Sequence, residues 1–143
     1  GYIYILVTIS GLLAAYSHRI SECFGETAAI KLLFFAAGLA CIMLALSSNP
    51  VISVLGILVL RISASLFVPI RMDIENRQVN ISSRATILSV YSSITNVAAV
   101  GTNLIFGKMA DISVKYSMAS GALFCFIGLF VYSVWDLKFN TEK

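Results

Sequence analysis

Long stretches without a charged side chain constrain this sequence more than any other feature. No Asp, Glu, Lys or Arg occurs within residues 1–17, 32–60, 62–70, 85–107 and 116–135. A helix needs about 20 mostly apolar residues to cross the hydrocarbon core of a bilayer. Most of these stretches approach or exceed that length, so we expect lipid to be the main solvent of the chain.

The composition argues against an ordinary soluble domain. Of the 143 residues, 59% are hydrophobic and only 12% are charged, whereas soluble domains carry about a quarter charged residues. The net charge of +3 is small, and the basic residues lie between the apolar stretches. This placement favours contact with membrane headgroups over a nucleic-acid surface. We therefore expect membrane lipid as a partner and no nucleic acid.

The apolar stretches predict five transmembrane helices, at about residues 2–17, 28–46, 51–68, 85–107 and 116–135. Only helices satisfy their backbone hydrogen bonds locally in lipid, and the alternation typical of barrel strands is absent. Ser47-Ser48-Asn49-Pro50 predicts a tight turn, and Pro69 predicts the end of the third span. Residues 71–84 and 108–115 are then loops. The predicted fold class is an all-α membrane protein, with residues 1–143 in one bundle.

The basic residues predict an orientation in the cell membrane. If the first loop is cytoplasmic, the inner segments hold seven Lys and Arg residues and the outer segments hold two. This bias follows the positive-inside tendency and places the C-terminus of a multi-pass protein in the cytoplasm. The uncharged outer start and the odd number of spans lead us to expect further sequence upstream.

Arg61 is the charged residue that falls in the middle of a predicted span. A charge there costs at least about 2.5–3.5 kcal/mol on insertion scales, so it normally faces a bundle interior or a wet cavity. Ser65 lies one turn further along the same face. Arg61 is thus a candidate for substrate contact or gating, with a structural Arg that pairs within the bundle as the alternative.

The fourth predicted span carries a polar stripe. Ser89, Ser92, Asn96, Ala99 and Asn103 recur at helical spacing and share one face. Amide side chains on a lipid-facing helix need a partner, either another helix or water. We therefore consider Ser92, Asn96 and Asn103 as candidates to line a substrate cavity, with bonding between helices as the alternative.

No catalytic or metal-binding motif is present. The sequence lacks the zinc-protease, nucleophile-elbow and phosphate-loop patterns, and metal ligands do not cluster. None of the acidic residues lies within a predicted span, so an intramembrane carboxylate for proton transfer is absent. We expect a protein that is not an enzyme and needs no cofactor or metal.

Residues 69–111 carry motifs of one known family. Asn76-Arg77-Gln78 is followed by a spacer and by Arg84-Ala85-Thr86-Ile87-Leu88-Ser89, and Gly107-Lys108-Met109-Ala110-Asp111 comes at the end of the same span. This series resembles the C-terminal half of major facilitator superfamily transporters. The loop with His18, Arg19 and Gly25 is similar to a loop of that family but lacks its Asp-Arg pair and the basic cluster after the glycine.

The resemblance implies a fold, a function and partners. The chain would supply helices eight to twelve of a transporter that moves a small solute by alternating access between two helical bundles. Its partners would be a small-molecule substrate and the missing N-terminal helices of the same transporter. The alternative is a small stand-alone membrane protein that acts as a scaffold or partner subunit. Further spans upstream would distinguish the two.

Overall fold

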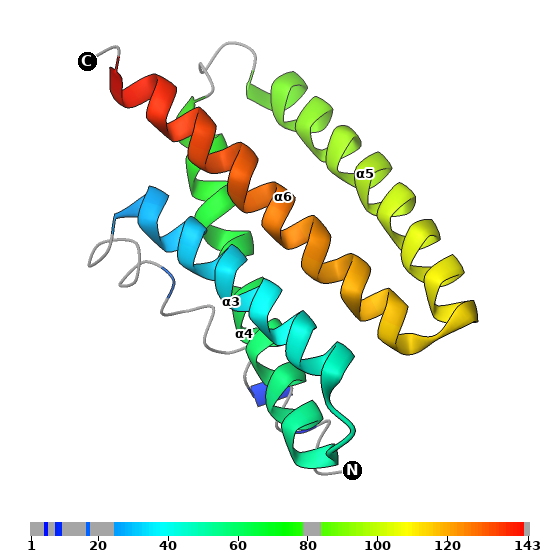
Figure 1. The fold of residues 1–143 in the computed structure, drawn as a ribbon. Helices are drawn as coiled ribbons and strands as arrows, with labels where there is room; N and C mark the ends of the chain where they lie inside the picture. Colours follow the sequence, from blue (N-terminus) through cyan, green and yellow to red (C-terminus); the bar gives the residue numbers. More distant parts are fainter. Residues whose placement is uncertain (1–4, 6–7, 10–16, 18–24, 79–83, 142–143) are drawn as a thin grey trace.

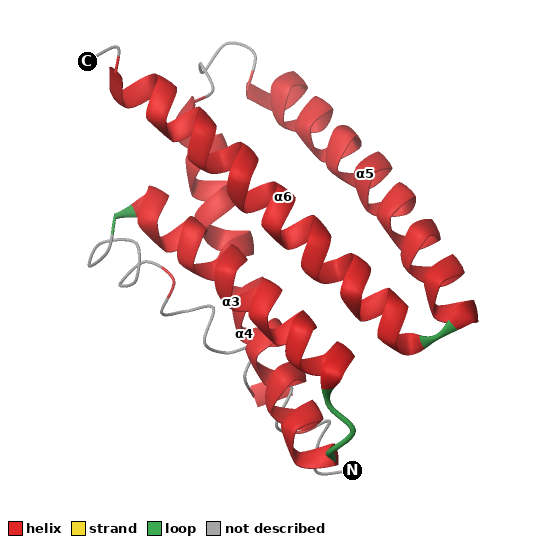
Figure 2. Cartoon of the chain, viewed as in Figure 1, coloured by secondary structure: helices red, strands yellow, loops and turns green. Residues whose placement is uncertain are grey.

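Four long helices make up nearly all of the described structure. The computed structural model describes residues 5, 8–9, 17, 25–78 and 84–141. The helices are α3 (Glu26–Leu46), α4 (Pro50–Gln78), α5 (Arg84–Ile112) and α6 (Val114–Thr141). The described residues contain no strand, and short turns join α3 to α4 and α5 to α6 (Figure 2). This confirms the predicted all-α fold class for the described part of the chain.

α3 is the centre of the packing. It packs against both α4 and α6, and α5 packs mainly against α6 (Figure 1). The buried core joins α3 to α4 through Ala29, Ile30, Leu33, Leu66 and Ile70. The rings of Phe34 and Phe67 add an edge-to-face contact with centroids 5.3 Å apart, a geometry that aromatic pairs prefer.

α6 approaches its neighbours closely through small residues. A Cβ atom added to Gly121 would lie 3.0 Å from Cζ of Phe106 on α5 and 3.2 Å from Sγ of Cys41 on α3. Ser117 on the same face is buried, and its hydroxyl donates to the carbonyl of Phe106 at 3.2 Å. Small side chains of this kind let membrane helices approach one another.

The turn between α3 and α4 lies where the sequence predicts it. The amide of Asn49 donates to the Ser47 hydroxyl at 3.1 Å, and the amide of Val51 donates to Oδ1 of Asn49 at 3.0 Å. Asn49 therefore satisfies a free N–H at the start of α4, and Pro50 occupies the first turn, where it needs no donor.

The predicted end of a helix near Pro69 is wrong, because α4 continues through Pro69 to Gln78. Proline removes one hydrogen bond and disfavours the helix by about 3 kcal/mol. Beyond it, however, Ile70 is buried and Ile74 packs on the core. Two ion pairs at a spacing of four residues, Arg71 with Glu75 and Asp73 with Arg77, also support the extra turns. Most of the expected loop 71–84 is therefore helix, and the expected loop 108–115 is helical up to Ile112.

Three of the described helices are long and apolar enough to cross a membrane, namely Glu26–Leu46, Pro50–Arg77 and Val114–Asp136. Their surfaces expose many large apolar side chains, which supports a membrane-embedded chain. α5 forms a helix as predicted but is not one of the three, and its role as a membrane span remains a prediction. The first expected span, 2–17, lies almost entirely outside the described residues.

Candidate functional site

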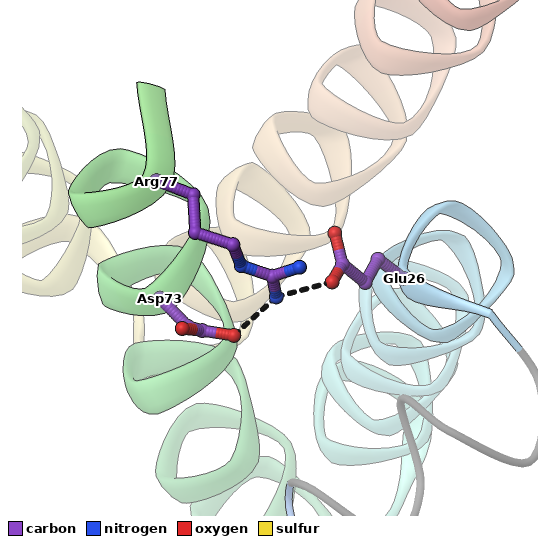
Figure 3. A network of polar contacts seen from close by, with 3 residues as sticks. All are labelled: Glu26, Asp73 and Arg77. Atoms are coloured by element: carbon purple, nitrogen blue, oxygen red, sulfur yellow. Dashed lines mark hydrogen bonds and ion pairs between the residues drawn. The ribbon is translucent and has the colours of Figure 1, made fainter. Parts of the chain in front are cut away.

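Charged side chains from α3 and α4 meet at one end of the bundle. Arg77, near the end of α4, forms ion pairs with Glu26 at the start of α3 and with Asp73 one turn earlier on α4. Figure 3 shows the guanidinium of Arg77 between the two carboxylates. The network therefore links the start of one helix to the end of the next.

A second ion pair joins α3 to α6 near the same end. Nζ of Lys31 lies 2.6 Å from Oδ2 of Asp136. The Asp136 side chain is only 15% exposed, and partial burial strengthens a charged hydrogen bond relative to one in water. Together, the two interactions tie α3, α4 and α6 to one another at this end of the bundle.

A largely apolar cavity of about 510 Å³ lies between α3, α4 and α6. We call it the aromatic cavity, because Phe34, Phe67, Tyr132 and Trp135 form much of its wall. The rings of Tyr132 and Trp135 have centroids 5.9 Å apart. A second apolar space of about 170 Å³ also borders Phe34 and Phe67 and is lined by Ala37, Leu60 and Ala64. Apolar spaces therefore lie on both sides of the Phe34–Phe67 contact.

Arg71 and Glu75 form the charged part of the aromatic cavity. Nε of Arg71 lies 3.1 Å from Oε1 of Glu75, within ion-pair range. The same nitrogen is buried and makes no hydrogen bond with a described residue, so the contact with Glu75 is close but poorly directed. A buried donor without a hydrogen bond is costly, and Arg71 thus retains unused binding capacity.

A second, more polar cavity of about 220 Å³ separates α4 from α5. We call it the polar cavity. Arg71, Glu75 and Asn76 line it from α4, and Ser92, Thr95 and Asn96 line it from α5. Arg71 and Glu75 therefore stand between the aromatic cavity and the polar cavity and form part of the wall of both.

The candidate cavity residues of the sequence lie in different places. Ser92 and Asn96 line the polar cavity, whereas Asn103 is exposed two turns further along α5. Arg61 is exposed on α4 and lines neither cavity, and Ser65 is partly buried one turn away. Arg61 precedes Arg71 by ten residues, about 15 Å along a helix axis. The described residues thus place Asn96 beside Arg71 in one cavity and leave Arg61 outside it.

The residues of the family motifs are also spread along the bundle. Gly25 precedes α3 with a φ of 79°, a conformation that favours glycine. Asn76 lines the polar cavity and Arg84 begins α5 at the charged end. Gly107 and Asp111 are exposed near the opposite end of α5. His18 and Arg19 lie outside the described residues.

Several polar side chains of α5 differ in their hydrogen bonding. The hydroxyls of Ser93, Thr95 and Thr102 donate to the carbonyl four residues earlier at 2.7–2.9 Å. The side chains of Asn96 and Asn103 form no hydrogen bond with another described residue. The helix backbone therefore satisfies these three hydroxyls, whereas the two amides have no partner in the described part of the chain.

Sequence reasoning missed Arg71, Glu75 and the pairing of Lys31 with Asp136. The spacing of four between Arg71 and Glu75 was a usable signal, but it fell in a segment expected to be a loop. The Lys31–Asp136 pair joins residues 105 positions apart, and no local pattern indicates such a contact.

Comparisons of the chain with protein-family models, curated proteins and solved structures give no match. The transporter resemblance of residues 69–111 therefore remains a prediction from the sequence.

Proposed function

We propose that this chain forms part of the C-terminal half of a secondary transporter that moves a small solute across the cell membrane by alternating access. The observation that carries the proposal is the exposed amide stripe of α5, which lies beside a polar cavity in a bundle of apolar helices. Under this proposal, the stripe faces water and substrate in the transport pathway.

The physical reason is the cost of unpaired amides in lipid. Asn96 and Asn103 are exposed and have no hydrogen-bond partner in the described residues. In a bilayer such groups need another helix or a water-filled cavity. Under the proposal, further helices of the same transporter lie opposite α5 and enclose the pathway with it.

Arg61 supports the same proposal from α4. Its side chain is exposed in the middle of a helix that is apolar enough to span the membrane. A charge at that depth normally marks an ion or substrate pathway. α3, α4 and α6, which the ion pairs hold together, would then form the body that supports Arg61 and α5.

Cysteine accessibility tests whether the amide stripe of α5 faces water. In the full-length transporter, with the native cysteines replaced, Asn96→Cys should react in cells with a small water-soluble thiol reagent. Val97→Cys is the matched control, because Val97 is the neighbouring residue and is 74% exposed on α5. It should not react, since a thiol in lipid does not ionise. Equal protection of both positions would contradict the proposal and favour a scaffold in which α5 contacts a partner protein.

Transport by variants tests the function itself. Asn96→Ala and Arg61→Ala should insert normally but lower the transport rate at least about tenfold, as expected when one charge-assisted contact in the pathway is lost. Val97→Ala should transport at the unchanged rate. Normal transport by both site variants would overturn the assignment of these two residues.

The proposed orientation has its own test. Thr27 at the start of α3 and Ser48 in the turn before α4 are both exposed, at opposite ends of α3. Thr27→Cys should be protected from a membrane-impermeant reagent in intact cells, whereas Ser48→Cys should be labelled. The reverse pattern would contradict a cytoplasmic C-terminus.

A further inference from the structure

We propose that the aromatic cavity binds a small zwitterion that carries an apolar or aromatic group, of about the size of an aromatic amino acid. Arg71 and Glu75 would bind the two charges of this ligand, and the rings of the cavity would bind its apolar part. The inference concerns binding alone, so it goes beyond the proposed function and does not depend on transport.

The size and walls of the cavity fit the apolar part of such a ligand. Its volume is about 510 Å³, within the range of roughly 300–1,000 Å³ typical of small-molecule sites. Phe34 and Phe67 contact each other on one side, and Tyr132 and Trp135 contact each other on α6. Aromatic rings offer both apolar surface and favourable edge-to-face contacts to a ligand ring.

The charges of the cavity fit a zwitterion better than a simple ion. Arg71 and Glu75 stand 3.1 Å apart at the closest atoms, and both line the cavity. An anion attracted by Arg71 would also meet the carboxylate of Glu75, and a cation attracted by Glu75 would meet the guanidinium. A ligand with one charge of each sign satisfies both groups and brings no net charge into a largely apolar cavity.

Arg71 is able to accept a new partner. Its Nε makes no hydrogen bond with a described residue, and its side chain lines the cavity and is 36% exposed. The other charges nearby are already engaged, because Lys31 pairs with Asp136 and Arg77 pairs with Glu26 and Asp73. Arg71 and Glu75 are therefore the described charges best placed to receive a ligand.

Trp135 makes the proposal measurable. It is the single tryptophan of the chain and lines the cavity, so its fluorescence in the 143-residue chain in lipid nanodiscs reports occupancy. L-phenylalanine is the zwitterionic probe. Three control probes each lack one feature. L-Phenylalaninamide keeps only the positive charge, N-acetyl-L-phenylalanine keeps only the negative charge, and glycine lacks the ring.

We expect L-phenylalanine to change the Trp135 fluorescence saturably, with each of the other three probes binding at least about tenfold more weakly. A charged hydrogen bond contributes about 1.5–3 kcal/mol, and 1.4 kcal/mol corresponds to tenfold in affinity. Arg71→Gln and Glu75→Gln should each weaken L-phenylalanine binding by a similar factor. The double variant R71E/E75R, which retains both charges, should recover part of the loss.

Two Val→Phe substitutions on α6, one inside the cavity and one outside it, control for effects on folding. Val131 lines the cavity and is 61% exposed, so Val131→Phe should occupy the space and abolish binding. Val134 on the same helix is 49% exposed and does not line the cavity, so Val134→Phe should bind normally. The proposal is overturned if no probe gives a saturable change, if the single-charge probes bind as tightly as L-phenylalanine, or if Val131→Phe leaves binding unchanged. Binding without transport would leave it standing and count against the proposed function alone.

Discussion

α3 and α5 have similar helical geometry but opposite surroundings. About a third of the apolar stretch of α3 is buried, twice the share found in α4 and α6, and the helix packs against both of these neighbours. α5 packs mainly against α6, and most of its side chains are exposed. This chain thus covers more of the apolar helix α3 than of the more polar helix α5.

The difference shows that the two helices depend on different partners. Ala29, Ile30 and Leu33 of α3 are buried among side chains of the same bundle. The amides of α5 lack a described partner, although an amide in lipid needs one. We infer that changes on α3 and at its contacts disturb the packing of the chain itself, whereas changes on the open face of α5 break no packing contact within the described residues.

The largest effect on stability is expected at the contact of α6 with α3 and α5. Gly121→Val should lower the free energy of unfolding by about 2–3 kcal/mol, because the new methyl groups meet the Phe106 ring and the Cys41 sulfur. Denaturant titration in detergent micelles, followed by circular dichroism, measures this change. The control is Gly101→Val on α5, where an added Cβ meets nothing within 4 Å. Equal losses for the two variants would refute the contrast between the helices.

A smaller effect is expected at the ion pair between α3 and α6. Lys31→Met should lower the free energy of unfolding by about 1–2 kcal/mol, because a partly buried charged hydrogen bond is lost. The double variant Lys31→Met/Asp136→Leu should recover part of this loss. It removes the carboxylate together with the lysine, so no carboxylate is left without the Lys31 ammonium. A double-mutant cycle on thermal unfolding gives the coupling. Strictly additive losses would show that the two residues do not interact.

A modest gain is expected on α5. Gly101→Ala should raise the free energy of unfolding by at most about 0.5–1 kcal/mol, because alanine loses less backbone entropy in a helix and the new methyl group enters open space. The same titration measures the gain. A loss of stability would reveal a close neighbour at Gly101 and argue against an open face on α5.

The smallest effect is expected for Asn103 in the isolated chain. Asn103→Leu should change the free energy of unfolding by less than about 0.5 kcal/mol, since the side chain is exposed and bonds to no described residue. Thermal unfolding in micelles tests this. A large loss would mean that the chain itself supplies a partner to the amide, and the proposed pathway-facing role of α5 would lose its main support.

Local composition and periodicity were enough to predict much of the fold. The helices expected at 28–46 and 116–135 begin and end within a few residues of the main apolar parts of α3 and α6, and the Asn49-Pro50 turn lies as predicted. Such features depend on neighbouring residues, because lipid forces each apolar stretch to satisfy its own backbone. The polar stripe of α5 follows from spacing alone for the same reason, although its role in transport remains a prediction.

Tertiary structure decided the features that depend on which helix faces meet. Local sequence rules predict a helix end at Pro69. α4 nevertheless continues, because Ile70 and Ile74, which follow the proline, pack against the core formed with α3. Arg71 and Glu75 belong to a cavity wall only because α3, α5 and α6 approach α4 at that level. The Lys31–Asp136 pair needs α3 and α6 in one particular register. Hydrophobicity determines whether a helix lies in lipid or in water. Because the hydrophobic effect is non-directional, it does not determine which side chains of two helices face each other, and packing decides this.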